Sequence, residues 1–149
     1  MGYIRYVLMV VVDPSATFTV GLTKKKGPAF LLNRITFPGG KIEKNEPVLA
    51  AASREMLEET GLTISEDRWV VYEDKMLDGY QLIKLAAISP KVLHARAMEE
   101  EPVWHLNIGN HLAYAVNQPD QYAPDFLNTL RGALYAVQEG LSLSMPQAA

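Results

Sequence analysis

Residues 37–62 read FPGGKIEKNEPVLAAASREMLEETGL, and they contain the clearest helix signal in the chain. The run from Glu46 to Thr60 predicts a helix, because Pro47 suits a first turn and the consecutive alanines that follow have high helix propensity. Gly61 suits the left-handed conformation in which many helices end. The Pro-Gly-Gly sequence before the helix predicts an irregular loop over 37–40.

The predicted helix carries a stripe of carboxylates beside an apolar stripe. At about 100° per residue, Glu55, Glu58 and Glu59 fall within roughly 100° of one another, next to Leu49 and Met56. Carboxylates that converge repel one another unless a cation lies between them. Oxygen ligands favour Mg²⁺ or Mn²⁺ over zinc, and Mg²⁺ commonly recruits substrate phosphates. The stripe therefore predicts a divalent metal site and a phosphorylated substrate.

The spacing of the glycines, glutamates and arginine in this stretch is specific. Gly40, five residues, Glu46, seven residues, Arg54-Glu55-Met56, one residue, Glu58-Glu59, one residue and Gly61-Leu62 resemble the Nudix box at every defining position. Phe37-Pro38-Gly39 resembles the usual lead-in of that family. The resemblance implies an α/β (α+β) Nudix fold, with a mixed β-sheet sandwiched between helices. It also implies a hydrolase that cleaves a nucleoside diphosphate linked to another moiety, with Mg²⁺ or Mn²⁺.

The same resemblance implies roles for individual residues. Glu58 and Glu59 would be metal ligands, and Glu55 a further ligand or the base that activates water. Arg54 would orient these carboxylates with the help of Glu46, and the Gly39 carbonyl would complete the coordination shell. Some family members take the base from a later loop, for which this chain offers Glu99, Glu100 and Glu101; Glu100 and Glu101 are the candidates, and a solvated acidic turn is the alternative.

The substrate is less specified than the reaction. A (deoxy)nucleoside triphosphate or related nucleotide is the first expectation, with Arg34, Tyr80 and Trp104 as candidate substrate contacts. Tyr80 lies where diadenosine polyphosphate hydrolases of the family carry a tyrosine, so those substrates and nucleotide sugars stay as alternatives. A nucleotide-sensing Nudix module without catalysis is the alternative of a different class; such modules typically lose box carboxylates, and this chain keeps them.

Turn signals and hydrophobic periodicity predict the remaining elements. A hairpin, a polar lysine turn over 24–26 and several further strands are expected around the central helix, followed by two helices. The lysine turn is expected to be a solvated hairpin tip, with contact to substrate phosphates as the alternative. The chain is expected to form a single domain over 1–141 with a frayed tail over 142–149. The predicted strands are 3–12, 18–23, 29–32, 69–72, 80–88 and 102–106, and the two helices are 111–116 and 124–138.

Composition narrows the class of protein. The 149 residues include no cysteine, and 14 Lys and Arg against 17 Asp and Glu give a net charge of −3. This excludes disulfides and thiolate metal sites and disfavours duplex nucleic acid as a partner. No apolar run is long enough to span a membrane and no signal peptide is evident, so a cytoplasmic protein with a small nucleotide ligand is expected. Strand 3–12 or the C-terminal helix is the candidate surface for a homodimer.

Overall fold

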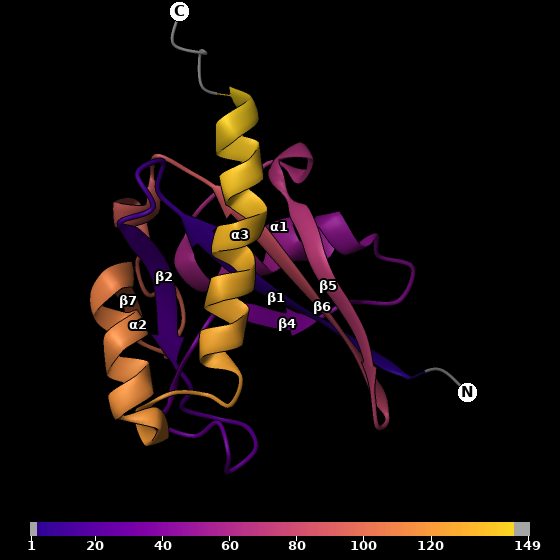
Figure 1. The fold of residues 1–149 in the computed structure, drawn as a ribbon. Coiled ribbons are helices and arrows are strands. Elements are labelled where there is room, and N and C mark those ends of the chain that lie inside the picture. Colours follow the sequence, from indigo (N-terminus) through magenta and orange to yellow (C-terminus); the bar gives the residue numbers. More distant parts are fainter. Residues whose placement is uncertain (1–2, 145–149) are drawn as a thin grey trace, which may run out of the picture.

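The computed structural model describes residues 3–144, in which seven strands form one mixed sheet (Figure 1). The main strand order is β3-β2-β1-β6-β5; β4 pairs with β1, and β7 pairs with β2. β1 runs parallel to β6 and antiparallel to β2 and β4. The strands are β1 (Ile4–Val12), β2 (Phe18–Thr23), β3 (Ile35–Thr36), β4 (Gly39–Lys41), β5 (Val70–Leu77), β6 (Tyr80–Ile88) and β7 (Val103–Asn107).

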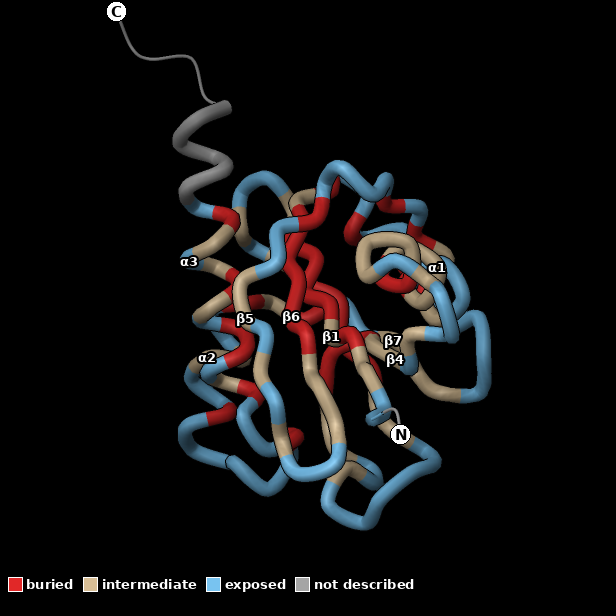
Figure 2. Tube along the Cα trace, turned by 90° about the vertical axis from the view of Figure 1, so that its right-hand side faces the viewer, coloured by how far each residue is buried: buried red, intermediate tan, exposed pale blue. Residues whose placement is uncertain are grey.

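Helices cover both faces of the sheet. In Figure 2, α2 and α3 lie on one side of the strands and α1 on the other, with the buried residues concentrated between them. This arrangement confirms the predicted mixed sheet sandwiched between helices. The helices are α1 (Val48–Thr60), α2 (Ile108–Asn117) and α3 (Phe126–Ser144), with short 3₁₀ turns η1 (Glu66–Arg68), η2 (Val92–His94) and η3 (Pro119–Gln121).

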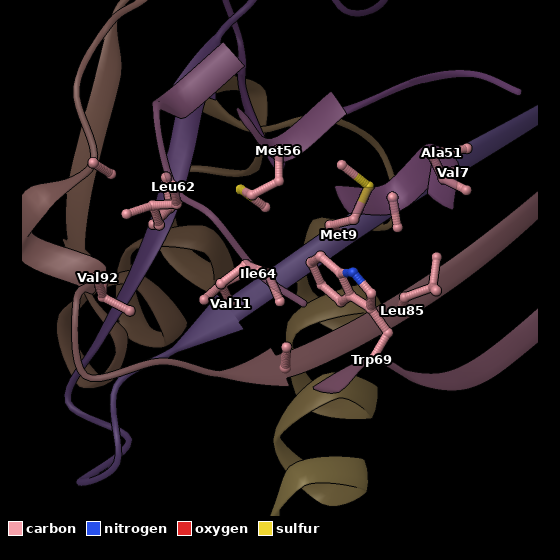
Figure 3. Packing of buried hydrophobic residues seen from close by; sticks show 14 of the residues in the cluster. Val7, Met9, Val11, Ala51, Met56, Leu62, Ile64, Trp69, Leu85 and Val92 are labelled. Carbon is pink, nitrogen blue, oxygen red and sulfur yellow. The ribbon is translucent and has the colours of Figure 1, made fainter. Parts of the chain in front are cut away.

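Two cores result from the alternation of side chains along the strands. In β1, Val7, Met9 and Val11 pack against α1, whereas Val10 and Val12 pack toward α2 and α3. Figure 3 shows the α1-side core, in which Met56, Leu62, Ile64 and Trp69 gather around β1. From Val7 to Val12, β1 therefore packs against a core on both faces.

Hydrogen bonds fix α1 on the sheet. The Trp69 indole N–H donates to Ser53 Oγ at 2.9 Å, and the Ser53 hydroxyl donates to the Ile64 carbonyl at 2.6 Å. Gly61 adopts the predicted left-handed conformation, with φ +76°, and its N–H donates to the Leu57 carbonyl. The helix begins at Val48 rather than Glu46, because Pro47 is extended. The residues that carry the carboxylates are thus held rigidly above β1.

Two local predictions were wrong. Gly39 and Gly40, predicted as part of a loop over 37–40, form β4 together with Lys41, because the adjacent edge of β1 supplies backbone partners and glycine brings no side chain into conflict. Residues 29–32 form successive turns instead of a strand, since the Leu31 N–H donates to the Pro28 carbonyl and the Leu32 N–H to the Ala29 carbonyl. Phe30 and Leu32 are exposed there.

The position of β1 bears on the expected homodimer. β1 has strands on both sides, so it offers no free edge to a second copy; of the two predicted surfaces, only the C-terminal helix stays a candidate.

That helix continues to Ser144, six residues beyond its predicted end. The predicted tail therefore starts inside α3, and 145–149 lie outside the described residues. No helix within the described part of the chain is long and apolar enough to cross a membrane.

Candidate active site

The Arg54 guanidinium is the centre of a carboxylate network on α1. Its Nε and Nη2 donate to the two Glu46 oxygens at 2.7 and 2.8 Å. Its Nη1 donates to Glu55 at 3.0 Å and Glu58 at 3.2 Å, and Nη2 also donates to the Lys41 carbonyl at 3.0 Å. All five N–H donors thereby have acceptors. Hydrogen bonds from Arg54 lower the pKa of Glu46 to about 2, so Glu46 is ionised and holds Arg54 in place.

Glu55 lies against the backbone of β4. Gly40 pairs with Val7 on the side of the sheet that faces α1, and a Cβ at Gly40 would overlap the Glu55 carboxylate. The Glu55 carboxylate therefore occupies the space that a side chain at position 40 would fill. Burial raises the pKa of Glu55, although the neighbouring Arg54 opposes the shift. The fold thus holds this carboxylate in a place that disfavours its charge.

Glu59 is more strongly perturbed. Its Oε2 accepts a hydrogen bond from the Gly39 N–H at 3.0 Å. Burial, with the nearby charges of Glu55 and Glu101, raises the pKa of Glu59 to about 8, even though the Gly39 amide and Lys24 favour the ionised form. Glu58, in contrast, has an exposed side chain that contacts Arg54. The three box carboxylates therefore differ in environment, which their common stripe in the sequence does not reveal.

The acidic loop 99–101 lies at the end of α1. The Arg96 N–H donates to the Thr60 carbonyl at 2.9 Å and the Met98 N–H to the Glu59 carbonyl at 3.4 Å, so backbone hydrogen bonds tie the chain leading into this loop to the helix. Glu99 is among the charges that raise the pKa of Glu55. The structure therefore brings the loop expected from the sequence next to the box.

The sequence predicts a solvated lysine turn over 24–26, but in the structure this turn contacts the acidic loop. The Lys24 Nζ donates to Glu101 Oε1 at 3.2 Å, and the Lys25 N–H donates to Glu101 Oε2 at 2.7 Å. The Lys26 Nζ lies 2.5 Å from Glu100 Oε1, with both side chains exposed. The lysine turn and the acidic loop, far apart in sequence, are thus direct neighbours.

The donor set fits a hard divalent cation. Glu55 and Glu59 are carboxylates held close to one another in a partly buried place that disfavours their charge, and such groups gain most from a bound cation. Within the described residues, no three His, Cys, Asp or Glu side chains are already arranged around a common point that could hold a metal ion. Arg54 accounts for part of this, because it engages Glu55 and Glu58.

The candidate substrate contacts lie elsewhere. Tyr80 begins β6 and its ring contacts Tyr6 edge to face at 5.7 Å. The Trp104 indole N–H donates to Thr23 Oγ1 at 2.8 Å, and Arg34 donates to the Tyr122 carbonyl at 3.4 Å. Strand alternation directs Tyr80 and Trp104 toward the α2–α3 side, as for Ala86 and Leu106 on the same strands. These two side chains therefore lie across the sheet from the carboxylates.

The α2–α3 side has a charged cluster that sequence reasoning missed. Lys84 of β6 is buried, and its Nζ lies 2.6 Å from Asp125 and 2.7 Å from Glu73. Asp125 precedes α3 with φ +69° and also accepts a hydrogen bond from Asn128. The available signal was Lys84 itself, the single charged residue within the apolar run 82–88.

Comparison with known proteins identifies the family. A family model described as NUDIX domain matches residues 2–93. The chain belongs to the Nudix family. The match includes the whole box and confirms the Nudix hydrolase predicted from its spacing. A search of curated proteins found no match.

Solved structures share the fold at low identity. The Nudix domain of NrtR from Shewanella oneidensis, complexed with ADP ribose, has a TM-score of 0.72 and 15% identity over 92% of this chain and 90% of that one. A bifunctional NMN adenylyltransferase/ADP ribose pyrophosphatase from Francisella tularensis, complexed with AMP and a Mn ion, has a TM-score of 0.64 and 16% identity over 94% of this chain. A MutT/nudix family protein from Enterococcus faecalis has a TM-score of 0.60 and 21% identity over 72% of this chain. The matched regions cover only 42% and 44% of the last two proteins.

Proposed function

We propose that this Nudix hydrolase is a Mg²⁺- or Mn²⁺-dependent pyrophosphohydrolase of nucleoside diphosphate derivatives, acting in the cytoplasm. The observation that carries the proposal is the pair of perturbed carboxylates, Glu55 and Glu59, set against the Gly39–Gly40 backbone of β4. Buried carboxylates of raised pKa in one place are typical of functional sites, because a fold without a task for them would not benefit from burying them.

Each box residue has a role in this proposal. Glu55, Glu58 and Glu59 would hold the metal with the Gly39 carbonyl, and a bound Mg²⁺ or Mn²⁺ would polarise a phosphoryl oxygen and acidify water. Arg54 keeps the carboxylates oriented while Glu46 holds Arg54 from behind. The base that receives the proton from water is Glu55 or a carboxylate of the acidic loop. Positioning and neutralisation of charge supply most of the acceleration in phosphoryl chemistry.

A (deoxy)nucleoside triphosphate is the first substrate we propose, with Arg34 as the candidate contact, because Tyr80 and Trp104 lie across the sheet from the carboxylates. A nucleotide sugar is the second, because the NrtR domain binds ADP ribose and the Francisella protein is named an ADP ribose pyrophosphatase. Diadenosine polyphosphates follow from the position of Tyr80. A nucleotide-sensing module is the alternative of another class, and the complete set of carboxylates favours catalysis over it.

The test is a phosphate-release screen with nucleoside triphosphates, ADP ribose, other nucleotide sugars and diadenosine polyphosphates, each with Mg²⁺, with Mn²⁺ and with EDTA. We expect turnover of at least one substrate that EDTA abolishes. Glu58→Gln and Glu59→Gln should each reduce kcat by about 100-fold or more, because each removes a charge that the reaction needs. Glu66→Gln, on the exposed turn η1, is the matched control and should leave kcat unchanged. Nucleotide binding without metal-dependent turnover of any substrate would favour the sensing module.

A further inference from the structure

The register between β2 and β7 sets Lys24 opposite Glu101. Leu22 lies opposite Val103 in the antiparallel ladder, and the Thr23 N–H donates to the Pro102 carbonyl at 3.1 Å. Continuing this register by two residues brings Lys24 and Glu101 together. Residues two apart on a strand share a face, so both follow Leu22 and Val103.

That shared face is the one with the box carboxylates. Val20, two residues before Leu22, belongs to the core against α1, and Val103 packs against the same core. The charges of Lys24 and Glu101 both act on the pKa of Glu59, in opposite directions. The ladder therefore delivers one lysine and one loop carboxylate to the edge of the carboxylate cluster.

The three loop carboxylates are held differently. Both oxygens of Glu101 have donors, the Lys24 Nζ and the Lys25 N–H. The side chains of Lys24 and Glu101 are 27% and 17% exposed, whereas those of Lys26 and Glu100 are 78% and 59% exposed. A partly desolvated, two-point interaction fixes a side chain, while an exposed ion pair contributes little. Glu99 is exposed.

We propose that Lys24, together with the Lys25 backbone amide, is a positioning residue that holds Glu101 beside the box carboxylates, so that Glu101 is the loop carboxylate that serves the reaction. The inference rests on the proposed hydrolase function. Glu101, rather than Glu99 or Glu100, is then the loop carboxylate that takes part, and Lys24 and Lys25 of the lysine turn hold it in position.

The kinetic test compares Lys24→Gln, Lys24→Arg and Lys26→Gln on the best substrate of the screen. Lys24→Gln should lower kcat about tenfold or more with KM within about twofold, because a misplaced catalytic group slows the chemical step. Lys24→Arg should restore most of kcat, since it keeps the cation. Lys26→Gln removes a neighbouring but exposed ion pair and should change kcat less than about twofold. A raised KM with unchanged kcat in Lys24→Gln, or equal losses in Lys24→Gln and Lys26→Gln, would overturn the proposal.

A second measurement does not depend on turnover. The protection of the Lys25 amide from hydrogen exchange in the metal-free protein, corrected for the intrinsic rate of each sequence, should fall in Glu101→Ala, which removes its acceptor, and in Lys24→Gln, but not in Lys26→Gln. If no substrate is hydrolysed, the proposed function fails while this measurement still reports whether Lys24 holds Glu101. Unchanged protection of the Lys25 amide in Lys24→Gln would contradict the positioning role, whatever the kinetics show.

Discussion

The two faces of the sheet carry charged clusters of opposite character. On the α2–α3 side, burial tends to raise the pKa of Asp125, but hydrogen bonds from Lys84 and Asn128 outweigh it and lower the pKa. On the α1 side, burial raises the pKa of Glu55 and Glu59 despite Arg54 and Lys24. One cluster is stabilised by its own ion pairs. The other cluster keeps Glu55 and Glu59 where burial disfavours their ionised forms, and a bound cation would stabilise those forms.

The largest effect is expected at Lys84, which we expect to be structural. Lys84→Met leaves Asp125 and Glu73 without their shared cation, and should lower the free energy of unfolding by about 3 kcal/mol. Urea denaturation in EDTA measures this loss. Lys91→Met, at an exposed position, is the control and should change stability by less than about 0.5 kcal/mol. A Lys84→Met protein as stable as wild type would show that the two clusters do not differ as described.

A smaller effect is expected from filling the space at Gly40. In Gly40→Ala the new methyl group overlaps the Glu55 carboxylate, so Glu55 must move. We expect a loss of about 1–2 kcal/mol in stability, as in other overpacked sites, and a fall in metal-dependent kcat. Gly109→Ala is the matched control, because its Cβ would meet only Asn107 Oδ1, at 3.6 Å. Equal behaviour of the two variants would show that Glu55 does not need its place against β4.

The third effect is the dependence of stability on pH without metal. The pKa of Glu59 is about 8 in the folded protein against an ordinary value of 4.5, so between pH 5 and 8 the folded state binds more protons than the unfolded state. The free energy of unfolding therefore falls as pH rises through this range. In EDTA, the melting temperature should drop by roughly 5–10 °C from pH 5.5 to 8.

Glu59→Gln tests the source of that slope. It keeps an acceptor for the Gly39 N–H but cannot ionise, so its melting temperature should vary less with pH. Mg²⁺ at pH 8 should raise the melting temperature of the wild type more than that of Glu59→Gln. An identical pH slope in both proteins would assign the effect to other groups.

The sequence predicted the elements that are specified by neighbouring residues in the chain. The helix over α1 followed from alanines and its glycine end, and the Asp78-Gly79 turn joined two predicted strands that pair as β5 and β6. β4 was not predictable in this way, because glycine has low strand propensity and the partner edge on β1 lies some 30 residues away. Residues 29–32 have the opposite problem, an apolar run with no strand beside it.

The candidate site divides along the same line. Arg54 and its glutamates lie within one helix and the segment before it, so their spacing indicated that they would converge. The approach of Lys24 to Glu101 depends on the β2–β7 register across 77 residues. The approach of Lys84 to Asp125 spans 41 residues and depends on where the chain before α3 lies on the sheet. Neither contact has a local signature, which is why the sequence predicted a solvated lysine turn.

The hydrogen bonds from Arg96 and Met98 to the last turn of α1 have a consequence for engineering. They tie residues 96–98, which lead into the acidic loop, to the end of α1, so the position of this segment depends on the position of the helix. A loop transplanted from a relative to change the reaction would keep its alignment only if the graft brings both backbone donors, and the natural boundaries of such a graft are therefore residues 95 and 107, the last of β7.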